Sequence, residues 1–193
     1  MKLLPFSLQT FQNIITGGYV YVDKTKYVYD AVSKGKAYFL SRPRRFGKSL
    51  LLSTFKALFS GPTDPNGPPQ GLFAGLWISQ TDYDFTQRYT VINLDISGES
   101  NSPEELKENL KIELEDLAAQ ENLDISSSLP GSMLSKLIKG LSRKHGTTVV
   151  VLIDEYDAPV SDNLDNIDLA KANQKILKDF YQCPQLKEAK GHP

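Results

Sequence analysis

The segment that most constrains the fold is the apolar run TTVVVLI at residues 147–153, which ends in Asp154 and Glu155. Its apolar residues are β-branched or leucine, and polar residues do not alternate with them. A strand of this kind is typically covered on both faces, as in a parallel sheet between two layers of helices. The run therefore predicts an α/β fold built on a parallel sheet.

Strands and helices are expected to alternate along the rest of the chain, which supports a parallel sheet. Extended segments are predicted at residues 19–22, 36–41 and 89–97. Apolar spacing, together with glycine and proline stops, predicts helices at residues 8–16, 25–33, 47–60, 102–117, 131–145 and 166–181. In the helix after Ser102, Glu105 completes a capping box.

The length of 193 residues suits one domain, which we place at residues 1–181, followed by a loose tail at 182–193. No apolar run of about 18 residues is present, so no membrane span is expected. One cysteine cannot form an internal disulfide, which favours a reducing compartment and a cytoplasmic protein. A net charge of −1 argues against binding of nucleic acid or membrane by the whole surface.

The segment RPRRFGKS at residues 42–49 has the properties of a phosphate-binding loop between a strand and a helix. Gly47 lets the backbone approach a phosphate closely. Lys48 would reach the β- and γ-phosphates, and Ser49 would hold Mg²⁺. The full pattern has glycine five residues before Gly47, where Arg42 stands. The alternative is a helix whose first turn reads Gly-Lys-Ser by chance.

Asp154 and Glu155 form a second candidate site at the end of the apolar strand. Asp154 would ligate Mg²⁺, largely through water. Glu155 would orient the attacking water or accept its proton. A solvated acidic turn is the alternative for this pair alone. Because both motifs follow predicted strands in the expected order, together they predict one nucleotide site.

Three segments resemble the AAA-ATPase-like family: GGYVYVDKT at 17–25, YFLSRPRRFGKSLLLSTFKALF at 38–59 and VVVLIDEYDAPV at 149–160. The resemblance extends to about residue 181 and fades after ILKDFY. It makes the arginine-rich loop a family trait. It implies a P-loop NTPase-like fold of three αβα layers, commonly followed by a PD-(D/E)XK nuclease-like domain.

The resemblance also implies ATP with Mg²⁺ as the ligand, and it assigns roles residue by residue. It makes Lys48 and Glu155 catalytic and Ser49 and Asp154 metal ligands. The arginines are left open between contacts to phosphates and contacts to a neighbouring acidic surface. The residues expected to bind the nucleotide are Arg44, Arg45, Phe46, Gly47, Lys48, Ser49 and Leu50.

Three other acidic residues are weaker candidates. Asp23 lies in the YVDKT match, where Asp23 or Thr25 is expected to cap the helix that follows. A position of Asp23 near the adenine is the alternative. Asp95 ends the middle strand and could face the site. Asp157 is expected to be a turn carboxylate before Pro159 or a further site residue.

Related ATPases insert a later strand between the two functional strands, and no such strand is predicted after Glu155. We therefore expect a fold that is incomplete after the acidic strand, a truncated chain with little activity alone, and unpaired strand edges that favour self-association. The expected function is ATP binding, with hydrolysis in the intact protein. The alternatives are a non-hydrolysing switch that acts on a protein partner and a nucleic-acid-associated ATPase that serves a nuclease-like domain.

Overall fold

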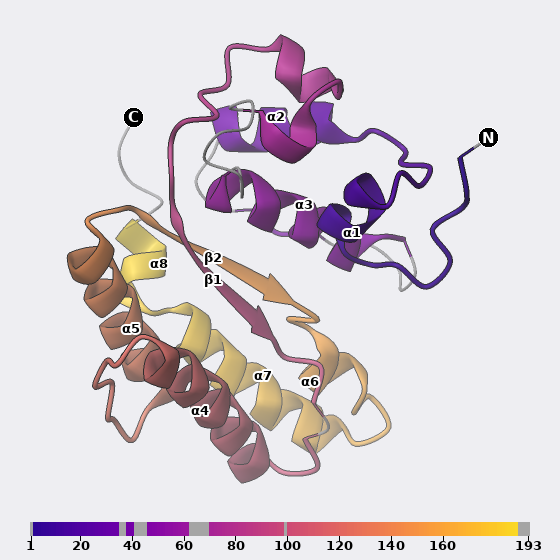
Figure 1. Ribbon diagram of the computed structural model, residues 1–193. Coiled ribbons are helices and arrows are strands. Elements are labelled where there is room, and N and C mark those ends of the chain that lie inside the picture. Colours follow the sequence, from indigo (N-terminus) through magenta and orange to yellow (C-terminus); the bar gives the residue numbers. More distant parts are fainter. Residues whose placement is uncertain (1, 35–37, 41–45, 62–69, 99, 189–193) are drawn as a thin grey trace. The chain divides into compact units, whose positions relative to one another are not determined.

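The computed structural model describes residues 2–34, 38–40, 46–61, 70–98 and 100–188 (Figure 1). The chain divides into two compact units, Met1–Val91 and Ile92–Pro193. The first unit is helical, and the second combines helices with a small sheet. No helix in the described part of the chain is long and apolar enough to cross a membrane.

The first unit is held together by an aromatic core. Phe11 stacks on Phe73 with ring centroids 4.8 Å apart, and the main-chain amide of Phe11 donates a 2.8 Å hydrogen bond to Ser53 Oγ. These contacts join α1 to α3 and to the short helix η1. The elements are α1 (Phe11–Thr16), α2 (Thr25–Lys34), α3 (Lys48–Ser60), and the 3₁₀ helices η1 (Gly71–Phe73) and η2 (Trp77–Gln80).

Two extended segments predicted in this unit differ from the structure. Residues 19–22 form no strand; the Val20 amide donates to Leu3 O at 2.9 Å, which is a single bond and not a ladder. Residues 38–40 likewise have no regular secondary structure, and the rest of the predicted strand at 36–41 lies outside the described residues. The three-layer arrangement predicted around that strand therefore stays a prediction.

The second unit contains the sheet and the longer helices. Strands β1 (Thr90–Asp95) and β2 (Val149–Asp154) run parallel, as Figure 1 shows, so the fold is mixed α/β as predicted. Ser102 Oγ accepts a 3.1 Å hydrogen bond from the Glu105 amide, so Ser102 caps helix α4 (Pro103–Gln120) as predicted. The helices are α4 (Pro103–Gln120), α5 (Pro130–His145), α6 (Ala158–Ser161), α7 (Ile167–Tyr181) and α8 (Pro184–Glu188).

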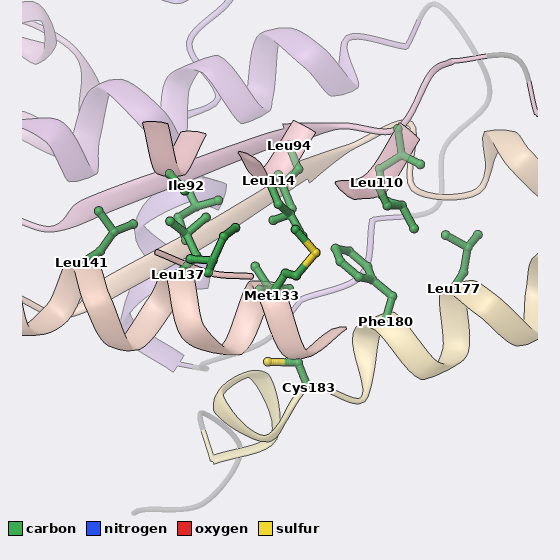
Figure 2. Close-up of a cluster of buried hydrophobic side chains, with 14 of the residues drawn as sticks. Ile92, Leu94, Leu110, Leu114, Met133, Leu137, Leu141, Leu177, Phe180 and Cys183 are labelled. Carbon is green, nitrogen blue, oxygen red and sulfur yellow. The ribbon is translucent and has the colours of Figure 1, made fainter. Parts of the chain in front are cut away.

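The core of the second unit lies between one face of the sheet and helices α4, α5 and α7 (Figure 2). Every second residue of each strand points into it: Ile92 and Leu94 from β1, and Val151 and Ile153 from β2. All β2 residues are half-buried, and helices cover the strand on its core face, whereas the predicted cover on its other face stays a prediction. Within the described residues the sheet has only two strands, so β2 is an edge strand.

The C-terminal segment differs from the loose tail predicted for residues 182–193. Cys183 is only 3% exposed, and Leu186 of α8 packs against the same core. The apolar contacts of these two side chains order residues 183–188, although the surrounding sequence is polar. Residues 189–193 lie outside the described part of the chain.

Candidate functional site

The backbone at the start of α3 has the conformation that the glycine in Gly-Lys-Ser was expected to provide. Gly47 occupies the N-cap position with φ 77° and ψ 30°, in the left-handed region. Its carbonyl accepts the first helical hydrogen bond, from the Leu51 amide at 3.0 Å. A β-carbon built on Gly47 would meet no atom of the described residues within 4 Å. The dihedral angle, and not crowding, therefore favours glycine at this position.

The first turn of α3 has the electrostatics of an anion site. It begins with Lys48, Ser49 and Leu50, it carries no acidic residue, and Gly47 offers no side-chain oxygen as a cap. The partial positive charge of a helix N-terminus favours a phosphate there. Phe46, directly before the glycine, is 62% exposed. The predicted contacts of Arg42, Arg44 and Arg45 lie outside the described residues.

Buried contacts of its second and third turns hold α3 in the first unit. Thr54 is fully buried, and its Oγ1 donates a 2.9 Å hydrogen bond to the Leu50 carbonyl. Leu58 is 2% exposed and belongs to the aromatic core. The buried side chains of Thr54 and Leu58 therefore anchor α3, whose first turn is the candidate site.

Asp23 caps the start of α2, as the sequence predicted. Its Oδ1 accepts hydrogen bonds from the amide and the hydroxyl of Thr25, at 2.8 and 2.6 Å, and its Oδ2 accepts one from the Trp77 amide at 2.7 Å. Partial burial would raise the pKa of the Asp23 carboxyl, but the hydrogen bonds from Thr25 and Trp77 outweigh it and lower the pKa.

The acidic pair lies at the carboxyl end of β2. The Asp154 carbonyl accepts a 3.2 Å hydrogen bond from the Ile96 amide, next to the end of β1. Asp154 Oδ1 accepts a 3.0 Å hydrogen bond from the amide of Glu155. Glu155 has φ 46°, a left-handed conformation that side chains other than glycine rarely adopt. The chain therefore turns sharply at the residue proposed to act on water.

Asp95 is the last residue of β1, and Asp154 is the last residue of β2. Because the strands are parallel, both residues lie at the same end of the sheet. Both side chains lie on the face opposite the core, because Leu94 and Ile153 point into it. Asp95 Oδ1 accepts a 3.0 Å hydrogen bond from the Ser97 amide. The two strand-end carboxylates are thus on one face of the second unit. No group of three or more potential metal-ligating acidic, histidine or cysteine side chains occurs among the described residues.

Two residues of α7 contact the segment after Glu155, and the sequence did not single them out as functional. Tyr181 Oη donates a 3.0 Å hydrogen bond to the Tyr156 carbonyl. Asn173 Nδ2 donates a 2.9 Å hydrogen bond to the Pro159 carbonyl. Asn173 stands on the apolar side of its helix, and a polar residue there could have indicated a buried hydrogen bond. Nothing in the sequence distinguished Tyr181 from other core aromatic residues. Asp157 stands at the N-cap of α6 but makes no side-chain cap there.

A family model described as predicted AAA-ATPase matches residues 5–192. The chain belongs to this AAA-ATPase-like family. The match continues past residue 181, so the predicted fading of the resemblance after that point is wrong. The matched residues include both candidate motifs, and they associate the chain with nucleotide binding. The roles of individual residues, and a nuclease-like domain beyond them, stay predictions.

A curated relative is the "Uncharacterized protein in vnfD 5'region" of Azotobacter chroococcum mcd 1. It is 35% identical to this AAA-ATPase-like chain over 193 residues, which are 99% of the chain and 36% of the relative. The chain therefore spans about a third of the length of the relative that it matches. No solved structure matches the chain.

Proposed function

We propose that this AAA-ATPase-like chain binds ATP with Mg²⁺ on a P-loop-type fold, through the first turn of α3. The observation that carries the proposal is the left-handed Gly47 at the N-cap, followed directly by Lys48 and Ser49. This backbone can approach a phosphate without a side chain in the way. Family membership supports a nucleotide as the source of that phosphate.

Each residue at this helix start has a distinct role in the proposal. The amides from Phe46 to Leu50 donate to phosphate oxygens, and Lys48 neutralises their charge. Arg44 and Arg45 add charge-assisted contacts. Ser49 offers its hydroxyl, and Asp154 its carboxylate, to Mg²⁺. These oxygen donors fit Mg²⁺, which binds through few carboxylates and takes most other ligands from phosphates and water.

We propose hydrolysis as the reaction of the intact protein. Bound Mg²⁺ would neutralise negative charge on the phosphates. Glu155 orients the attacking water and accepts its proton, while Lys48 stabilises charge on the γ-phosphoryl group. Asp154 holds the Glu155 amide, which fixes the backbone of the base.

Calorimetric titration with Mg-ATP tests the binding site. The substitution Lys48→Ala is expected to weaken binding by at least about tenfold, because a charge-assisted contact is lost. Lys56→Ala is the matched control, since Lys56 is an exposed lysine on the same helix. Equal affinity of the Lys48 variant and the control would remove the phosphate-loop assignment.

Phosphate release tests the reaction. Glu155→Gln is expected to keep Mg-ATP affinity and to lower turnover by about 10²–10⁴-fold, the usual contribution of a general base. Asp165→Asn is the control, since Asp165 is an exposed carboxylate that follows α6. Turnover retained in the Glu155 variant would assign the base elsewhere. An intact protein that binds ATP and releases no phosphate would instead be a non-hydrolysing switch.

A further inference from the structure

We propose that Tyr181 and Asn173 of α7 are positioning residues that hold the turn carrying Glu155. The turn begins at the end of β2 and leads into α6. The consequence for turnover rests on the proposed function, whereas the effect on the turn itself does not.

The Glu155 turn needs support from outside the local chain. With φ 46°, Glu155 is in a region where its β-carbon crowds the backbone, so the conformation persists only when surrounding contacts impose it. The Ala158 amide donates a 2.9 Å hydrogen bond to the Glu155 carbonyl and closes the turn locally. The local main-chain bonds of this segment use the carbonyls of residues 155, 157 and 158, whereas the carbonyls of residues 156 and 159 accept bonds from side chains.

Tyr181 supplies the first of these contacts. Its hydroxyl donates to the carbonyl of Tyr156, the residue directly after Glu155, at 3.0 Å. Burial raises the pKa of Tyr181, with further contributions from Asp157 and Tyr156. The hydroxyl therefore stays protonated, and remains a donor, over the physiological range of pH.

Asn173 supplies the second contact from the same helix, two turns earlier. It is fully buried, and its Nδ2 donates to the Pro159 carbonyl at 2.9 Å and to Ser100 Oγ at 3.4 Å. Ser100 follows β1, so this amide joins the segments after both strands. Asn163 Nδ2 reinforces the junction with hydrogen bonds to the same Pro159 carbonyl and to the Ser100 carbonyl.

The cost of burying Asn173 also favours a positioning role. Its Oδ1 is buried without a hydrogen-bond partner in the described part of the chain. A buried polar atom without a partner destabilises a fold, and an apolar residue of similar volume would avoid that cost. An amide at this place is therefore explained by the Pro159 carbonyl and the Ser100 hydroxyl that it holds.

Hydrogen exchange of the Ala158 amide tests whether α7 holds the turn. Tyr181→Phe is expected to lower its protection at least about tenfold, because the Tyr156 carbonyl loses its donor. Tyr83→Phe is the matched control: Tyr83 Oη is buried without a partner in the described residues, so its removal breaks no bond. Unchanged protection in the Tyr181 variant would overturn the proposal.

Turnover of Mg-ATP tests the consequence for Glu155. Displacement of a catalytic group by about 1 Å can cost on the order of 10²-fold. We expect Tyr181→Phe to lower kcat at least about tenfold with KM within about twofold, since the phosphates are proposed to bind at α3 and Asp154 precedes the residues that Tyr181 holds. Tyr83→Phe should change neither constant. Equal losses in kcat and in ATP affinity would indicate general damage to the fold and contradict the proposal.

Asn173→Leu keeps the test decisive if the tyrosine variant folds poorly. Leucine has the same heavy-atom branching as asparagine, although its methyl groups are bulkier, and it removes both the donors and the unpaired oxygen. The melting temperature is therefore expected to stay close to that of the wild type while kcat and Ala158 protection fall. Retained protection here would also overturn the proposal. If the intact wild-type protein shows no turnover, the proposed hydrolysis fails, and hydrogen exchange alone decides whether α7 holds the turn.

Discussion

The carboxylate of Asp23 accepts a 2.7 Å hydrogen bond from the main-chain amide of Trp77, 54 positions further along the chain. The hydroxyl of Thr25, itself bonded to Asp23, accepts a 3.1 Å hydrogen bond from the Ile78 amide. The start of α2 is thereby joined to η2. A motif that the sequence marks as a helix cap is also a tertiary contact of the first unit.

The substitution Asp23→Ala is expected to destabilise the first unit by about 2 kcal/mol, because it removes a helix cap and leaves the Trp77 amide without its acceptor. Trp77 is the one tryptophan of the chain, so its fluorescence in urea follows this unit. Asp84→Ala is the control, since Asp84 makes the same pair of bonds to Thr86 but only local ones. An equal loss in both variants would contradict the tertiary role.

The contribution of Asp23 to stability is expected to depend on pH. The folded-state pKa lies below the ordinary value of 3.8, so the stabilisation is fully present above that value. It is lost as the pH falls through the folded-state pKa, because the carboxyl then protonates in both states. Urea unfolding of wild type and Asp23→Asn should therefore differ near neutral pH and converge in acid. A constant difference down to about pH 2 would exclude this linkage.

Gly47→Ala is expected to lower both the stability of the first unit and its affinity for Mg-ATP, and a control variant distinguishes the two effects. Alanine at φ 77° should cost about 1–2 kcal/mol, although its β-carbon would meet no atom in the part of the chain that the structure describes. Gly18→Ala is the control, with φ 66° and equally open space. Both variants should lose similar stability by urea unfolding, and the Gly47 variant alone should lose Mg-ATP affinity. Full ATP affinity in Gly47→Ala would show that phosphate does not approach this backbone.

Glu155→Gly is expected to stabilise the second unit by about 1 kcal/mol, because glycine accepts φ 46° without strain. Asn122→Gly is the control, since asparagine tolerates its φ of 52° better than glutamate would. Circular dichroism during urea unfolding measures both. A gain in stability that accompanies lost turnover would show that the strain is retained for function. A destabilised Glu155 variant would show that its side chain contributes contacts that outweigh the strain.

Leu134→Ala is expected to destabilise the second unit by about 2–5 kcal/mol, the range for a buried leucine that leaves a cavity. Leu134 is fully buried in the core between the sheet and α5. Ile112→Ala is the control, because Ile112 on α4 is 49% exposed and should cost less than about 1 kcal/mol. The midpoint of urea unfolding followed by circular dichroism provides the comparison. Similar midpoints would contradict the packing of α5 on the sheet.

Local patterns in the sequence were sufficient to predict most helices and the two parallel strands. The Ser102 cap and the apolar periodicity of α4 act over a few residues, so they can be read without knowing the fold. The same holds for Gly47, whose type and position before Lys48 predict a phosphate-binding helix start. These features depend on backbone sterics and hydrogen bonds between near neighbours.

Tertiary structure decided what depends on residues far apart in the chain. Only the fold brings Asn173 to the Pro159 carbonyl and Asp23 to the Trp77 amide. Only packing orders Cys183 and Leu186 in a segment whose polar composition predicted a loose tail. The reason is physical: local sterics set the backbone of a single turn, whereas burial and long-range hydrogen bonds depend on which distant groups the chain brings together.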